Sequence, residues 1–150
     1  MTLNRRHFLT SLAAASVVPP SFAVAKEPTI FQVGGVAING ADPVAYFKTG
    51  SPDSVDNLHT VTWKGVEWRF DSAENANAFM NNPKGFAPAF GGYCAFAASR
   101  GYLAPTTPEA WTIYEGKLYL NANLRARELW LKDIPGNIAK GQANWPQILG

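Results

Sequence analysis

Apolar and polar residues alternate along two stretches of the chain, and each stretch surrounds a short polar turn sequence. The first covers residues 59–70 around Lys64-Gly65, and the second covers residues 111–120 around Glu115-Gly116. Aromatic and β-branched residues on both sides of such a dipeptide are typical of antiparallel strands joined by a tight turn. The sequence therefore predicts two β-hairpins, each with one face in a core.

Each predicted hairpin leads into residues with helical spacing. After the first, Asp71 and Glu74 form a capping-box pattern for a helix that ends before Pro83. After the second, Asn121 or Asn123 can cap a helix through residue 131. Two hairpin-plus-helix units of this kind could combine their apolar faces into one core.

Shorter helices complete the predicted fold. Asp42-Pro43 can cap a helix over about residues 43–47, and residues 93–99 precede a glycine at the usual C-terminal position. Pro135 lies where a last helix, over about residues 134–143, would start. We expect a small α+β domain in which two β-hairpins pack against several short helices.

The first 25 residues have the features of an export signal. Two adjacent arginines precede a short apolar run over residues 11–18, and small residues up to Ala25 offer a cleavage site. Paired arginines before such a run are typical of twin-arginine signals, and the run is too short to span a membrane. We expect residues 1–25 to be removed near Ala25, and residues 26–150 to form a periplasmic domain with a C-terminal helical extension.

The charge balance argues against two classes of partner. The chain has 13 Lys and Arg residues against 11 Asp and Glu residues. Removing the predicted signal takes away Arg5 and Arg6 and no acidic residue, so the two counts become equal at 11. Without a basic surplus, electrostatic attraction to nucleic acids or anionic membranes is missing. We therefore expect no nucleic-acid binding and no membrane insertion after signal cleavage.

Cys94 is the only cysteine, and it follows Gly91-Gly92 among aromatic residues. It has no second cysteine with which to form a disulfide within the chain. At the start of a short helix, free backbone N–H groups would favour its thiolate form. Free cysteines are also among the most buried residue types. A reactive or metal-binding thiol and a buried packing residue both stay open.

A few other side chains could complete a site around Cys94. His59, the only histidine beyond the predicted signal, could act as a base or as a second metal ligand. Met80 could add a thioether ligand, which suits copper. Each also has an ordinary interpretation, His59 as a surface residue and Met80 as a core residue. The aromatic residues expected to line a cofactor or small-ligand pocket near the sulfur are Tyr46, Tyr93 and Phe96.

Several motifs resemble the YHS domain family. They are Asn-Gly-x-Asp-Pro-Val-x-Tyr-Phe at residues 39–47 and Trp-Arg-Phe-Asp-Ser-x-Glu-Asn at residues 68–75. Gly-Gly-Tyr-Cys-Ala at residues 91–95 and the segment 130–136 are similar to the exported bacterial YHS-domain proteins. Some of those proteins are described as selenoproteins, with selenocysteine at the position similar to Cys94.

The resemblance implies a treble-clef-like module and a metal-handling function. YHS domains occur with metal-transporting ATPases and resemble modules that hold a metal through cysteines. Ala45 and Asp71 replace the two cysteines of that pattern here, so the usual thiolate pair is absent. Metal binding would then depend on Cys94, with His59 as the second ligand and copper or zinc as the metal.

Three functions stay open from the sequence. The first is a periplasmic YHS-type protein that binds a soft transition metal or a similar small ligand, such as a small thiol, through Cys94. The second is an enzyme, a thiol-based redox or peroxide-reactive protein that uses Cys94 as its catalytic residue. The third is a non-catalytic module that binds a protein partner and keeps Cys94 buried. The chain has no glycine-rich phosphate loop and no Ser-His-Asp set.

Overall fold

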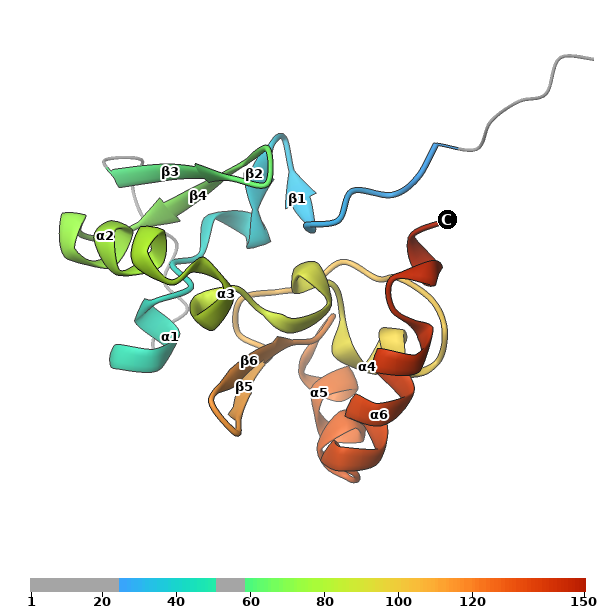
Figure 1. The fold of residues 1–150 in the computed structure, drawn as a ribbon. Coiled ribbons are helices and arrows are strands. Elements are labelled where there is room, and N and C mark those ends of the chain that lie inside the picture. Colours follow the sequence, from blue (N-terminus) through green and yellow to red (C-terminus); the bar gives the residue numbers. More distant parts are fainter. Residues whose placement is uncertain (1–24, 51–58) are drawn as a thin grey trace, which may run out of the picture.

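The computed structural model describes residues 25–50 and 59–150. Within these ranges, a four-stranded sheet and a separate hairpin combine with six α-helices and three 3-10 turns (Figure 1). The protein is therefore a small α+β domain, which confirms the predicted fold class. The predicted export signal lies outside the described residues.

The larger sheet contains the first predicted hairpin. Its strands, in spatial order, are β1 (Gln32–Val33), β2 (Val36–Ala37), β4 (Val66–Phe70) and β3 (His59–Trp63). β1 and β2 are antiparallel, β2 pairs parallel with β4, and β3 pairs antiparallel with β4. Alternate residues of β4 are fully buried, as its hydrophobic pattern predicted.

The second predicted hairpin forms β5 (Trp111–Tyr114) and β6 (Lys117–Leu120). Its turn has the same backbone as the turn of the first hairpin. Lys64 and Gly65 have φ of 52° and 74°, and Glu115 and Gly116 have φ of 48° and 73°. Two consecutive residues with positive φ match the twist of the flanking strands, which explains the glycine in both turns.

The helices follow the predicted order. They are α1 (Ala45–Lys48), α2 (Ala73–Asn81), α3 (Pro83–Phe86), α4 (Ala95–Ser99), α5 (Leu124–Leu131) and α6 (Ile134–Asn144). The 3-10 turns are η1 (Ile38–Gly40), η2 (Ala89–Gly92) and η3 (Gln147–Leu149). Asn123 caps α5, whereas α4 begins two residues later than expected, with Cys94 as its N-cap.

The predicted cap of α2 is wrong by one residue. Ser72, rather than Asp71, accepts a hydrogen bond from the amide of Asn75, at 3.1 Å. The backbone of Asp71 is engaged elsewhere, because its N–H donates to the carboxylate of Asp42 at 3.0 Å. This bond holds Asp71 at the end of β4 and leaves the capping position to the next residue.

One core joins the two hairpins. Trp68 and Phe70 of β4 share a buried cluster with Leu118 and Leu120 of β6, and Phe79 of α2 packs into the same cluster. The expected combination of two apolar faces is therefore present. Met80 lies outside this core, because it is 56% exposed on the outer side of α2, so its interpretation as a core residue is wrong.

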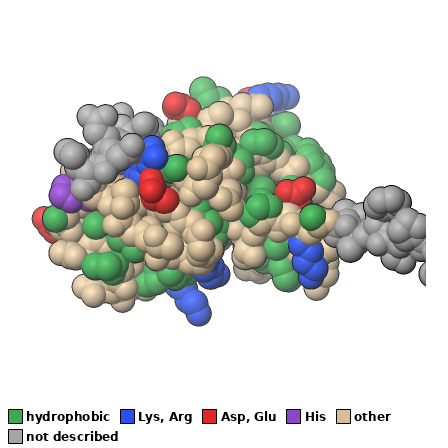
Figure 2. All heavy atoms as spheres, turned by 90° about the horizontal axis from the view of Figure 1, so that it is seen from above, with side chains coloured by type: hydrophobic (Ala, Val, Ile, Leu, Met, Phe, Trp, Pro, Cys, Tyr) green, Lys and Arg blue, Asp and Glu red, His purple; other side chains and the backbone are tan. Residues whose placement is uncertain are grey.

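The elements separate into two groups around the chain segment that precedes α4 (Figure 1). The four-stranded sheet lies with α1 and α2 on one side, and α4, α5 and α6 lie together on the other. Figure 2 shows charges of both signs scattered over one face of the molecule. In the part of the chain that the structure describes, no helix has the length and apolar character needed to cross a membrane.

Candidate functional site

Cys94 is buried and hydrogen-bonded on two sides. Only 1% of the residue is exposed. Its sulfur accepts a hydrogen bond from the amide of Ala97 at 3.4 Å, which makes Cys94 the N-cap of α4. The thiol also donates to Oδ1 of Asn121 at 3.5 Å. Both contacts of the sulfur therefore serve the local structure.

Asn121 links Cys94 to the end of β6. Its Oδ1 accepts the amide of Phe96 at 3.0 Å as well as the thiol of Cys94. The side chain is fully buried, and its Nδ2 has no hydrogen-bond partner within the described residues. A buried N–H group without a partner costs free energy. The two hydrogen bonds that Oδ1 accepts from α4 hold the side chain in this position.

The structure does not bring His59 and Met80 to Cys94. His59 begins β3 and Met80 lies on α2, and both elements are on the sheet side of the molecule (Figure 1). α4 lies on the opposite side. Over residues 25–50 and 59–150, no group of three or more His, Cys, Asp or Glu side chains could hold a metal ion. Metal binding through Cys94 stays a prediction.

The three aromatic residues predicted around the sulfur have separate surroundings. Tyr46 is buried under the ring of Trp111, and its hydroxyl donates to the carbonyl of Pro108 at 2.8 Å. Burial raises the pKa of Tyr46, and the nearby carboxylate of Glu109 raises it further. This tyrosine is a neutral anchor between α1 and the segment before β5.

Tyr93 and Phe96 flank Cys94 in sequence and border two different hollows. Tyr93 lines a hollow of about 340 Å³ with Phe31, and its hydroxyl donates to the carbonyl of Pro28 at 2.8 Å. Phe96 lines a hollow of about 200 Å³ and lies under the guanidinium of Arg100, 4.8 Å from the ring centroid. Cys94 lines neither hollow.

Asp42 is a buried cap, the role that the sequence predicted for it. Its Oδ1 accepts the amides of Val44 and Ala45 at 2.8 and 3.1 Å, just where α1 begins. Its Oδ2 accepts the amide of Asp71 and the side chain of Asn75. The two positions where the YHS pattern has cysteines, Ala45 and Asp71, are therefore bonded through their backbones to one carboxylate.

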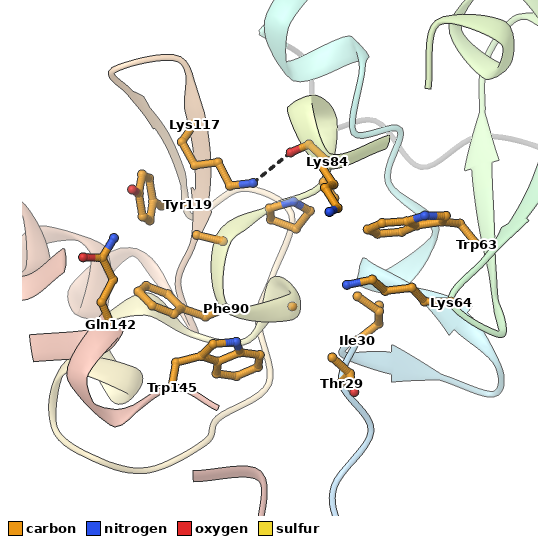
Figure 3. Close-up of a pocket in the computed structure, with 14 residues that line it drawn as sticks. Thr29, Ile30, Trp63, Lys64, Lys84, Phe90, Lys117, Tyr119, Gln142 and Trp145 are labelled. Carbon is orange, nitrogen blue, oxygen red and sulfur yellow. Dashed lines mark hydrogen bonds between the residues drawn. The ribbon is translucent and has the colours of Figure 1, made fainter. Parts of the chain in front are cut away.

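A larger pocket, which sequence reasoning missed, lies between the two groups of elements (Figure 3). Its volume is about 460 Å³. Three lysines line it, and none of its lining residues in the described chain is acidic. We call it the lysine pocket. The lysines are Lys64 from the first hairpin turn, Lys84 from α3 and Lys117 from β6, and the aromatic residues are Trp63, Phe90, Tyr119 and Trp145.

The ammonium groups of Lys64 and Lys117 each contact another residue that lines the pocket. Lys117 donates from Nζ to the backbone carbonyl of Lys84 at 3.1 Å. Nζ of Lys64 lies 4.7 Å from the ring centroid of Trp63, over its face. Partial burial lowers the pKa of Lys117, and the positive charge of Lys64 lowers it further. The pocket therefore concentrates positive charge that it does not neutralise internally.

The segment at the base of the lysine pocket has a left-handed backbone conformation at two consecutive residues. Phe90 and Gly91 both have positive φ, 53° and 62°. A Cβ on Gly91 would lie 1.9 Å from the carbonyl oxygen of Thr29, so only glycine lets the N-terminal segment cross at this point. This crossing forms one wall of the pocket, because Thr29 and Gly91 both line it.

The aromatic side of the lysine pocket is tightly packed. The rings of Phe90 and Trp145 have centroids 6.0 Å apart, and those of Phe90 and Tyr119 are 6.2 Å apart. A Cβ on Gly141 of α6 would lie only 2.6 Å from the ring of Phe90. The ring of Phe90 is therefore fixed against α6.

The sequence contained one sign of this pocket. Lys64 directly precedes Gly65 in the first hairpin turn, and Lys117 directly follows Gly116 of the second hairpin turn, at the start of β6. Nothing local to either turn shows that the two hairpins meet.

Comparisons with protein-family models, with curated proteins and with solved structures found no match to this chain. The resemblance to the YHS family therefore stays a prediction, and the function must be argued from the site.

Proposed function

We propose that this protein binds a small organic anion in the lysine pocket and that Cys94 has a structural role. The observation that supports this most directly is the convergence of Lys64, Lys84 and Lys117 on one cavity whose described lining is free of carboxylates. Cationic side chains without acidic neighbours create a positive potential that attracts anions.

Three further features support an organic ligand over a bare inorganic ion. Four aromatic side chains line the pocket, and two of them, Trp63 and Trp145, are partly exposed and give it apolar walls. The volume of about 460 Å³ lies within the range of small-molecule sites in proteins. A few charged groups among aromatic walls are the usual composition of such sites. The expected function is therefore binding of a molecule with an anionic group and an apolar body.

The role given to Cys94 follows from its bonds. Its sulfur lies at the start of α4, bonded to Ala97 and Asn121, and Cys94 does not line the lysine pocket. A buried thiol with both contacts made is protected from solutes. The proposal shares the buried, non-catalytic cysteine with the third function left open by the sequence, but it differs from that function in its ligand, which is a small anion and not a protein partner.

Calorimetry with matched probes tests the proposal. Benzoate and phenyl phosphate carry an anionic group on a ring, and benzyl alcohol is a neutral molecule of similar size. We expect at least one of the two anions to bind, and benzyl alcohol to bind more than about tenfold more weakly. Lys64→Gln and Lys84→Gln should each weaken binding of the anion several-fold.

The control removes a lysine outside the pocket. Lys132 is exposed and lines a different hollow, so Lys132→Gln changes the net charge equally and should leave affinity unchanged. Thermal unfolding of each variant establishes that it is folded. If neither anion binds, or if the pocket variants and Lys132→Gln bind alike, the proposed function is wrong.

A further inference from the structure

The lysine pocket has two unlike sides, and their chemistry restricts the ligand. The side chains of Lys64 and Lys84 extend into the gap from the side of Trp63, and Phe90 and Trp145 lie across the gap from them (Figure 3). A ligand that fills the gap would contact ammonium groups at one end and aromatic rings at the other.

The charge in the lysine pocket exceeds what one carboxylate neutralises. Lys64, Lys84 and Lys117 together carry three positive charges, and no ion pair within the described residues includes any of them. A monoanion would leave two of these charges unneutralised, and a dianion would leave one. Because Lys64 and Lys117 repel each other, the pocket gains more from a dianion.

The donors are ammonium groups rather than guanidinium groups. Lysine is a compact point charge with three N–H donors, which suits a tetrahedral group with several oxygens. A phosphate monoester has three terminal oxygens that can accept from different lysines, whereas a carboxylate has two. A phosphate group therefore offers these lysines more acceptor positions than a carboxylate does.

The second side is aromatic: the ring of Trp145 is partly exposed there, and the ring of Phe90, 7% exposed, lies behind it. Phe90 and Trp145 lie with ring centroids 6.0 Å apart at 64°, and α6 fixes the ring of Phe90 through the close approach of Gly141. Rings held this way are preorganised for stacking or edge contacts with another aromatic group. A branched or flexible aliphatic body would use this surface less completely.

We infer that the ligand is an aromatic phosphate monoester, with its dianionic phosphate among Lys64, Lys84 and Lys117 and its ring against Phe90 and Trp145. This inference rests on the proposed function, because it names the class of anion that the same pocket prefers. The other polar side chains that line the pocket are the Tyr119 phenol, the Gln142 amide and the Thr29 hydroxyl. Over the described lining, no carboxylate competes with the ligand for the lysines.

The test compares three probes at about pH 7.5 and low salt. Phenyl phosphate has the ring and the dianion, benzoate has the ring with a single charge, and inorganic phosphate has the charge without the ring. We expect phenyl phosphate to bind at least about tenfold more tightly than either of the others. The double variant Lys64→Gln/Lys84→Gln should abolish this preference, and Lys132→Gln should preserve it.

A pH titration gives a second readout. The second ionisation of a phosphate monoester has a pKa of about 6, so the dianion forms between about pH 5 and 7. Affinity for phenyl phosphate should rise several-fold over this interval, and affinity for benzoate should not, because benzoate is already ionised. His59 is the only histidine in the described chain and lies on β3, outside the pocket lining, so no pocket side chain produces the same step.

The outcomes separate the two proposals. Equal affinities for benzoate and phenyl phosphate, each lost in the lysine variants, would overturn the inference and keep the proposed function. Equal affinities for inorganic and phenyl phosphate would show that the ring is not recognised, and would also overturn the inference. Binding of neither aromatic anion would overturn both.

Discussion

The thiol of Cys94 lies 3.5 Å from Oδ1 of Asn121, 27 residues farther along the chain. This bond joins the start of α4 to the residue that follows β6. The same oxygen accepts the amide of Phe96, so Asn121 holds the first turn of α4 through two donors. The only cysteine of the protein therefore acts as part of the framework beside the lysine pocket, whose wall includes Tyr119 of β6.

The effect of substituting Cys94 on stability should depend on whether the new side chain can still cap α4. We expect Cys94→Ala to lower the free energy of unfolding by about 1–3 kcal/mol, because α4 loses its cap and Asn121 loses a donor. Cys94→Ser should cost less, since serine is itself a good cap and a donor. Chemical denaturation measures both. Equal losses in the two variants would contradict the capping role.

The thiol of Cys94 should be inaccessible in the folded protein. We expect alkylation by a maleimide to proceed only as fast as the protein unfolds, because 1% of the residue is exposed. The rate with and without denaturant measures this. Rapid labelling of the native protein would instead support the redox function for Cys94.

Native mass spectrometry tests the metal-binding hypothesis directly. We expect protein purified without chelator, its Cys94→Ser variant and its His59→Ala variant to show no bound copper or zinc. The reason is that the structure keeps His59 on the sheet side, away from α4 (Figure 1). A metal adduct present in the parent protein and lost from the Cys94 variant would favour metal binding over the structural role.

Asp71 should make the protein less stable near neutral pH. Asp71 is exposed, but partial desolvation by its neighbours raises the pKa of its carboxyl, and the hydrogen bond and negative charge of Asp42 raise it further, so the folded state favours the protonated form. Stability from this group is fully present below the ordinary pKa of 3.8 and is lost as pH rises through the raised value. Asp71→Asn should therefore raise Tm near pH 7, with a smaller gain near pH 4. A variant less stable than the parent at pH 7 would contradict this.

Gly91 should be far more sensitive to substitution than Gly116. Both have positive φ, 62° and 73°, so alanine strains the backbone at either position by about 1–2 kcal/mol. At Gly91 the added Cβ would also meet the oxygen of Thr29, whereas at Gly116 nothing lies within 4 Å. We expect Gly91→Ala to exceed the loss of Gly116→Ala by at least about 1 kcal/mol in denaturant unfolding. Similar losses of unfolding free energy in the two variants would contradict this prediction, because they would mean that the segment containing Thr29 moves away from the added Cβ.

In alkaline solution, the affinity for an anion should fall at a lower pH than the ordinary pKa of lysine predicts. The pKa of Lys117 is lowered by burial and by Lys64, so Lys117 loses its charge at a lower pH than an exposed lysine. Affinity for phenyl phosphate is highest while Lys117 is charged, and it should decline several-fold at a pH below the ordinary lysine pKa of 10.5. Lys117→Arg should shift the decline to higher pH, because arginine stays charged. An unchanged profile in this variant would exclude Lys117 as the titrating group.

Local patterns determined most of the fold. The alternation around Lys64-Gly65 and Glu115-Gly116 predicted both hairpins, because a positive-φ turn and period-two hydrophobicity are properties of neighbouring residues. Helix spacing and caps predicted α2, α5 and α6 in the same way. The cap of α2 moved from Asp71 to Ser72 because a distant carboxylate, that of Asp42, holds the backbone of Asp71.

The tertiary structure alone decided the candidate site. Lys64, Lys84 and Lys117 lie in three different elements, and each local pattern describes only an exposed turn, a short helix or a strand end. Likewise, the cluster of aromatic residues around Cys94 in sequence did not show that its partner is Asn121. By itself, the sequence predicted the two hairpins and the helices α2, α5 and α6, since those depend on contacts a few residues apart. Which charges share a pocket depends on how the two hairpins pack, and that arises only when the chain closes its common core.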